Sequence, residues 1–316
     1  MHASPTCKGR GEGERRFKLC NRIKTVRIQK RHWFSLAALA LIGLLVFLLL
    51  PPAEPIVNGH PLSYWIDEAR DEDLNESPEV IQSALSAMDD RCIRALINEV
   101  NWTPSPRLQE FENFSERWVH VDLPIHNAPD RRQGAALLLG QLGSRASNAI
   151  PALDLASRRW VGDPEAGTRA RASAIAALIL IRHDSVEPCA KKSLDYGDPV
   201  SYDYSAAIHF LGTNAASCVP MFVDAMQTTT NYQIRRRAVN ALGSIHSRPE
   251  LTVPALEALL KSSTDRNERM VALFGIADFG SAAKPVLVRY QNDSDESIRA
   301  VVDAVIGSID LSPRDR

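Results

Sequence analysis

Two short matches to catalytic motifs lie side by side near the carboxyl end of the chain. Asp278-Phe279-Gly280 has the order of the kinase motif whose aspartate holds magnesium. Ser281 and Lys284 have the spacing of the nucleophilic serine and the lysine of penicillin-binding proteins. Neither match has its companions, because no glycine-rich or catalytic loop accompanies the first and no Lys-Thr-Gly triplet follows the second. We interpret both as chance matches and expect that the chain is not an enzyme.

Histidine and cysteine, which often bind zinc and iron, are not spaced for metal binding. The chain has 8 His and 5 Cys, but neither a Cys-x-x-Cys nor a His-x-x-x-His pair. His183, His209 and His246 fall near the ends of predicted helices, and we interpret them as structural side chains. The sequence therefore predicts no metal ion and no cofactor.

A regular spacing of proline indicates the elements that would have to position any site. Five prolines, each in a short apolar segment, are 37, 32, 34 and 31 residues apart: Pro151, Pro188, Pro220, Pro254 and Pro285. Proline fits the first turn of a helix, where its missing N–H leaves no hydrogen bond unmade. We therefore predict that a helix begins at each proline, in a repeat of about 34 residues.

A second helical stretch, rich in alanine, precedes most of these prolines. Its expected end is an apolar residue followed by glycine, which suits a left-handed cap: Leu142-Gly143, Leu211-Gly212, Leu242-Gly243 and Phe279-Gly280. Aspartates stand where they can cap the helix starts: Asp130, Asp163, Asp198, Asp265 and Asp295. Basic residues open the helices, and we expect them to form a ladder with neighbouring aspartates: Arg131, Arg132, Arg169, Arg171, Arg235 to Arg237, Arg269 and Arg299.

Residues 131–310 resemble the HEAT repeats, most closely the short bacterial type first named from phycobilisome lyases. The resemblance rests on segments such as 131–143, Arg-Arg-Gln-Gly-Ala-Ala-Leu-Leu-Leu-Gly-Gln-Leu-Gly, followed by Ala-Ile-Pro-Ala-Leu. It implies an all-α fold, a right-handed α-solenoid of stacked helix pairs over residues 131–316. The second copy has Leu180-Ile181 in place of Leu-Gly, and the third lacks the early arginines.

The same resemblance raises two enzymatic possibilities. Some HEAT enzymes bind iron through His-Glu pairs, but no histidine of this chain is followed by glutamate. Phycobilin lyases work in the cytoplasm, whereas the amino-terminal segments predict export of the repeats. The alternative of an enzyme, or of a lyase-like accessory protein whose site is assembled from several repeats, stays open.

The amino-terminal segments indicate a membrane anchor. Residues 1–32 carry a net charge of +8, which leaves −9 for the rest of the chain. Residues 33–50 are uncharged and rich in leucine, and a helix of this length nearly spans a bilayer. No Lys or Arg occurs at 51–69, so we expect a cytoplasmic basic arm, a transmembrane signal anchor, and repeats outside the bacterial inner membrane, in the periplasm. A cleaved signal peptide is the alternative.

Between the anchor and the repeats we expect three segments. Residues 51–60 read as an extended tether, and residues 61–130 as an amino-terminal cap, a degenerate repeat and a loop. The cap helix places Leu62, Trp65, Ile66 and Ala69 on one face. The loop carries aromatic side chains, which we interpret either as a binding element or as a cover for an exposed repeat edge: Trp102, Phe111, Phe114 and Trp118.

Cys189 and Cys218 flank equivalent prolines of adjacent repeats. In an oxidising compartment they would form either a disulfide across neighbouring helices or a pair of small buried side chains. The sequence leaves both possibilities open.

The expected working surface is the concave groove lined by the proline-started helices. Its candidate partner-binding residues lie three to seven residues after the prolines: Asp154, Arg158, Lys191, Asp224, Gln227, Glu257, Lys261 and Arg289. The charges alternate in sign, so no basic track favours nucleic acid. The sequence therefore predicts a membrane-tethered scaffold that binds a protein or a peptide.

Overall fold

The computed structural model describes residues 54–70, 77–102, 128–158 and 164–311. The predicted arm and anchor, residues 1–50, and most of the aromatic loop lie outside these ranges. The chain divides into two compact units, Met1–Glu54 and Pro55–Arg316, and all described helices belong to the second. This unit is all-α apart from two paired segments of two residues each, Ile56–Val57 (β1) and His60–Pro61 (β2).

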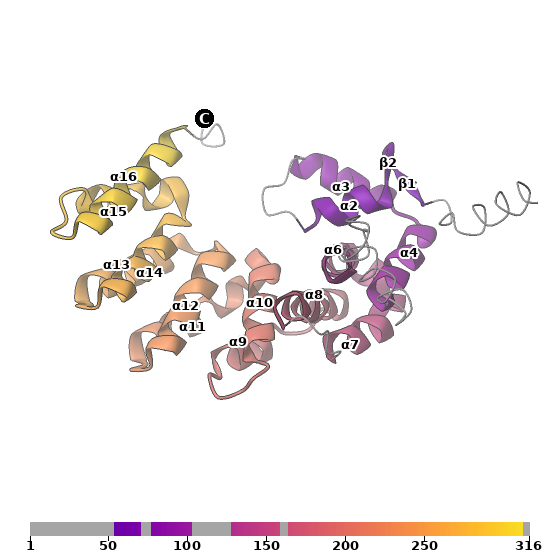
Figure 1. Cartoon of the computed structure of the whole chain (residues 1–316), viewed down its shortest axis with the longest axis horizontal. Coiled ribbons are helices and arrows are strands. Elements are labelled where there is room, and N and C mark those ends of the chain that lie inside the picture. The colour runs from indigo at the N-terminus through magenta and orange to yellow at the C-terminus, as the bar shows by residue number, and fades with distance from the viewer. Residues whose placement is uncertain (1–53, 71–76, 103–127, 159–163, 312–316) are drawn as a thin grey trace, which may run out of the picture. The chain divides into compact units, whose positions relative to one another are not determined.

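Fourteen α-helices, with four short 3₁₀ turns between or after some of them, follow in chain order in the described ranges (Figure 1). The first seven are α2 (Leu62–Glu68), α3 (Pro78–Ala87), α4 (Asp90–Asn101), α6 (Ala128–Leu142), α7 (Ile150–Arg158), α8 (Pro164–Arg182) and α9 (Glu187–Leu194). The others are α10 (Ser201–Leu211), α11 (Val219–Thr228), α12 (Tyr232–Ile245), α13 (Pro249–Ser262), α14 (Arg266–Ala277), α15 (Lys284–Leu287) and α16 (Glu296–Leu311). The 3₁₀ turns are η1 (Gly143–Ala149), η2 (Gly212–Cys218), η3 (Gly280–Ala283) and η4 (Val288–Tyr290).

The amino-terminal cap is built around the indole of Trp65. Its Nε1–H donates to the carbonyl of Val57 at 3.0 Å, which ties β1 to α2. Leu62, Trp65 and Ile66 are buried on the predicted face. Val57 is buried as well, so the second half of the expected tether packs with the helices.

α6 and α8 are the most enclosed helices and pack against each other. Small side chains permit the close approach: a Cβ on Gly140 would lie 3.0 Å from the Cα of Ala177. On another side, a Cβ on Gly134 would lie 2.1 Å from the backbone oxygen of Ile66 in α2. α8 also joins two hydrophobic clusters, because Ala172 and Ala176 belong to one and Ala174 and Ala177 belong to the other.

The later helices pack in chain order. α10 contacts α8 and α12, α12 contacts α14, and α14 contacts α16 (Figure 1). The proline-started helices pack beside them, as α11 does on α12 and α13. Phe222, Leu242 and Leu256 are fully buried between these layers. Each helix pair therefore completes its core with side chains of the next pair.

Four of the five prolines lie where the sequence predicts, at the first or second residue of a helix. These are Pro151 in α7, Pro188 in α9, Pro220 in α11 and Pro285 in α15. The prediction is wrong for Pro254, which lies inside α13. α13 begins earlier because Pro249 also fits a first helical turn, so residues 249–253 become helical there.

Three of the four predicted glycine ends are confirmed. Gly143, Gly212 and Gly280 have φ angles of 57°, 50° and 53°, which a residue without Cβ adopts at little cost. Gly243 is instead an interior residue of α12, which ends at His246 with a φ of 48°. A Cβ on Gly243 would lie 2.2 Å from Oδ2 of Asp278, so here glycine serves close packing.

The described cysteines are free thiols. Cys92, Cys189 and Cys218 are all buried, which corresponds to the second of the two sequence interpretations. Burial raises the pKa of Cys189 to about 12, and the nearby Cys218 adds to the effect. At neutral pH the thiol is therefore protonated and a poor nucleophile.

Within the described ranges, Ser201–Thr228 is long and apolar enough to cross a membrane. It comprises α10, η2 and α11, and Gly212 turns the chain between the two helices. Ile208 and Phe222 within it are fully buried in the core. Its apolar character is thus that of a packed helix pair.

Candidate functional site

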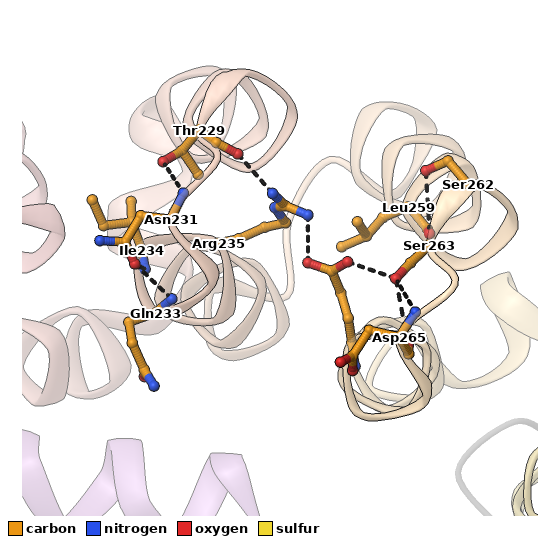
Figure 2. A network of polar contacts seen from close by, with 10 residues as sticks. Thr229, Asn231, Gln233, Ile234, Arg235, Leu259, Ser262, Ser263 and Asp265 are labelled. Carbon is orange, nitrogen blue, oxygen red and sulfur yellow. Dashed lines mark hydrogen bonds and ion pairs between the residues drawn. The ribbon is translucent and has the colours of Figure 1, made fainter.

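Arginines at the start of the first helices join neighbouring repeats. The expected aspartate partners are found for Arg171 and Arg269, whereas other arginines bond to helix-end carbonyls or to glutamate. Figure 2 shows the clearest case, in which the guanidinium of Arg235 lies between two repeats. Its Nη2 donates to the carbonyl of Thr229 at 2.8 Å, and its Nη1 bonds to the carboxylate of Glu268. Ser263 donates its hydroxyl to the same carboxylate at 2.6 Å. One arginine therefore links a carbonyl at the end of α11 to a carboxylate in the first turn of α14.

The position of Arg235 recurs along the chain. Arg132, Arg235 and Arg269 each lie 11 residues before the left-handed residue that ends their helix. Each donates to a backbone carbonyl at the end of the preceding helix: Trp102 at 2.8 Å, Thr229 at 2.8 Å and Leu260 at 3.2 Å. A cation there complements the negative end of the helix dipole. We call this set the arginine ladder.

The arginine ladder is absent from α8, where Ala172 lies 11 residues before the left-handed His183, and from α10. The residue 11 positions before Gly212 is Ser201, which is fully buried. An acid also stands in the first turn of α10, because the carboxylate of Asp203 accepts two hydrogen bonds from Arg171 of α8, at 2.8 and 2.9 Å. The pair is nearly enclosed, with side-chain exposures of 13% and 6%.

Arg237 of α12 replaces the missing arginine from the next repeat. Its Nη1 donates to the hydroxyl of Ser201 at 2.8 Å and to the carbonyl of Ser193, in the last turn of α9, at 3.1 Å. Its guanidinium carbon lies 4.4 Å from the ring centre of Tyr202 and 5.2 Å from that of Tyr196. Because Arg237 takes the place of the missing arginine, a cation and two tyrosine rings come together at the surface.

A cavity of about 440 Å³ lies at this interruption, mainly between α10 and α12. We call it the α10–α12 cleft. It is lined by Ser193, Tyr202, Ser205, His209, Gln233, Arg236, Arg237, Asn240, Ala241, Ser244 and Asp278. Its size is within the range of ligand pockets, about 300 to 1,000 Å³. The lining is mostly polar and comes from three repeats.

His209, Ser244 and Asp278 line one part of the α10–α12 cleft, and His246 lies beside Asp278 outside the lining. Nδ1 of His209 lies 2.9 Å from Oγ of Ser244, and His246 contacts the backbone carbonyl of Asp278. The Ser244 hydroxyl also donates to the carbonyl of Asn240 at 3.0 Å. Burial raises the pKa of the Asp278 carboxyl group, while His246 and His209 oppose this shift.

The eight residues predicted for the concave groove lie on other helices. None of them lines the α10–α12 cleft. Asp154 and Arg158 pair with each other at 3.0 Å, and Lys191 pairs with Glu187 at 2.7 Å. Asp224 and Gln227 are exposed on α11.

The structure brings the last three predicted groove residues together. The carboxylate of Glu257 accepts from Lys261 at 2.7 Å and from Arg289 of the next repeat at 2.6 Å. Burial raises the pKa of Glu257, but the hydrogen bonds from Lys261 and Arg289 outweigh burial, so the pKa lies below its ordinary value. These charges are thereby committed largely to one another.

The sequence prediction missed the α10–α12 cleft, although two signals pointed to it. The third copy lacks early arginines, and the fourth has three in a row, Arg235 to Arg237. Extra arginines in the fourth copy, next to a third copy without any, indicate that one of the three serves the neighbouring repeat.

The residues of the catalytic-motif matches lie in a repeat turn, because Phe279 is buried and Gly280 begins η3. In the described ranges no three His, Cys, Asp or Glu side chains are grouped to hold a metal ion.

Comparison with known proteins gives one partial similarity. A stretch of 140 residues is 30% identical to the 26S proteasome regulatory subunit RPN2 of Eremothecium gossypii. The match covers 42% of this chain but only 15% of that protein. No family model matches the chain. The similarity is compatible with a helical-repeat protein.

Proposed function

We propose that the chain is a membrane-tethered scaffold whose helical repeats bind a protein or a peptide outside the cytoplasm, without catalysis. The observation that carries this proposal is the chain-order packing of helix pairs from α8 to α16, joined by the arginine ladder. Stacked repeats in general form an extended surface that is larger than any single helix pair could offer. We further propose that the array is a right-handed HEAT-type solenoid.

The partial similarity to a regulatory subunit supports a protein as the partner. That protein is named as a component of an assembly, and a scaffold role here would be of the same kind. The basic arm and apolar segment at residues 1–50 are the basis for proposing the tether and the bacterial inner membrane.

Site-specific photocrosslinking in intact cells would test the scaffold role. A crosslinking residue would replace Gln227 of α11, on the predicted groove, and in a matched control would replace Glu79, an exposed residue of α3. We expect one set of proteins to be captured at Gln227 and not at Glu79. Equal capture at both positions, or at neither, would contradict the proposal. Reporter fusions to the carboxyl end should show an extracytoplasmic location.

One observation favours a second candidate function, an enzyme or enzyme-accessory protein with a site made by several repeats. His209, Ser244 and Asp278 come from three repeats and line one cleft. The Ser244 hydroxyl, however, donates its hydrogen bond to the Asn240 carbonyl, which leaves its oxygen to accept from His209 and is not the arrangement of an activated nucleophile. Labelling with a fluorophosphonate probe distinguishes the two functions, since a scaffold should stay unlabelled at Ser244.

A further inference from the structure

The α10–α12 cleft carries two adjacent arginines that have no carboxylate partner in the described part of the chain. Arg236 is exposed and makes no hydrogen bond or ion pair there. Arg237 bonds to a hydroxyl and a carbonyl, both neutral, and its Nη2 is buried without a hydrogen-bond partner. The nearby carboxylate of Asp203 is already occupied by Arg171. Positive charge is therefore left over at this end of the cleft.

Two tyrosines frame this charge and remain accessible. Tyr202 is 59% exposed and Tyr196 is 47% exposed, although both rings pack on the Arg237 guanidinium. Exposed tyrosine and arginine side chains are enriched at the energetic centres of protein interfaces. The rings and backbone bonds also hold Arg237 in one place, so a ligand would pay less to order it.

One face of α12 adds groups that suit a peptide backbone. Gln233, Arg237 and Asn240 follow one another at spacings of three or four residues and line the same cleft. A side-chain amide both donates and accepts hydrogen bonds, as a peptide group does. Arg236, beside them, can meet a carboxylate with two parallel hydrogen bonds.

We propose that the α10–α12 cleft binds an extended acidic segment of a partner protein. Aspartate or glutamate side chains of that segment bond to the exposed Arg236 and are attracted by the positive charge of Arg237 behind it, and its backbone bonds to Gln233 and Asn240. This inference rests on the proposed scaffold function and names the chemistry of the partner. A nucleic acid fits less well, because two adjacent arginines beside Asp278 do not form the run of basic side chains that successive phosphates need.

Selection from a library of short randomised peptides on the full chain, held in detergent micelles, tests the proposal. Peptides rich in Asp and Glu should be enriched, and their affinity should fall as salt is added. Arg236→Glu should weaken binding of the enriched peptides by about tenfold or more, because it replaces attraction with repulsion. Arg182→Glu, which changes an exposed arginine at the end of α8, should leave binding unchanged.

The other results would overturn the proposal. Enrichment of basic or purely apolar peptides, no enrichment, or equal loss in both variants would each do so. So would tighter binding of a single-stranded oligonucleotide at Arg236 than of any selected peptide. Circular dichroism of Arg236→Glu excludes loss of folding as the cause. Failure here combined with specific crosslinking at Gln227 would leave the scaffold function standing, whereas failure of both would remove it.

Discussion

The junctions on the two sides of α12 meet the same structural need in different ways. Toward α14, Arg235 of the arginine ladder bonds to a helix-end carbonyl and to the carboxylate of Glu268. Toward α10, Arg237 bonds to a carbonyl and the hydroxyl of Ser201, and stacks with tyrosines. The first junction neutralises its cation. The second leaves charge and aromatic surface at a cleft, which is why we place recognition there.

The largest expected effect on stability comes from breaking the ion pair between Asp203 and Arg171, which lies beside the junction between α10 and α12. Asp203→Ala leaves the enclosed guanidinium of Arg171 without its two charged hydrogen bonds. Removal of one partner of a buried pair costs about 3 to 5 kcal/mol, so the free energy of unfolding should fall by that amount. Urea titration followed by circular dichroism measures the change.

The double variant Arg171→Met/Asp203→Leu is the matched control for this prediction. Apolar side chains of similar volume replace both charges, so most of the lost stability should return. If Asp203→Ala alone is neutral, or if the double variant is as unstable as the single one, the pair does not hold α8 and α10 together.

A substitution at the junction between α12 and α14 should lower the free energy of unfolding by a smaller amount. Glu268→Ala removes one bond of Arg235 and one of Ser263, but Arg235 keeps the Thr229 carbonyl. We expect a loss of about 2 kcal/mol, typical of hydrogen bonds to a charged group. Glu296→Ala changes an exposed acid of α16 and should alter stability by less than about 0.5 kcal/mol. Equal effects of the two substitutions would show that the ladder is not a stabilising feature.

How far the sequence predicts these junctions depends on the range of the interactions. The helix pairs follow from local signals, such as Pro220 in a first turn and Gly212 at a left-handed end. The early arginines also indicated that a ladder exists. The expected aspartate partners hold only in part, as for Arg269 with Asp293, because a partner such as Ser193 for Arg237, 44 residues away, depends on which helices meet in space.

The two wrong predictions of helix ends have different origins. Gly243 has a signature that usually ends a helix, but the carboxylate of Asp278 occupies the place of its missing Cβ. Pro254 has a signature that usually begins one, but Pro249 begins the helix earlier. The candidate groove residues depend on such contacts too: Glu257 and Arg289 neutralise each other across a repeat. Local patterns therefore predicted most of the helices, but not which charged side chains stay available to bind a partner.

Arg237→Lys tests whether the junction between α10 and α12 needs the planar guanidinium. Lysine keeps the charge but lacks the planar group that stacks on Tyr202 while bonding to Ser193 and Ser201. We expect a loss of about 1 kcal/mol, measured by urea titration. Arg236→Lys on the same turn should be neutral, since Arg236 has no partner in the described ranges. Equal losses in both variants would refute a specific role for Arg237.

The smallest effect should come from Asp278, at the other end of the α10–α12 cleft. Burial raises the pKa of its carboxyl group above 3.8 in the folded chain, against the opposing influence of His246 and His209. Ionisation therefore destabilises the fold: the penalty is absent below the unfolded-state pKa, grows as pH rises through the window up to the folded-state pKa, and is complete above it. Asp278→Asn removes the penalty. Its thermal midpoint should exceed that of the unchanged chain at neutral pH, and the two should converge as pH falls toward 3.8. A gain of equal size at both pH values would mean that the substitution acts by packing against Gly243 and not through the charge.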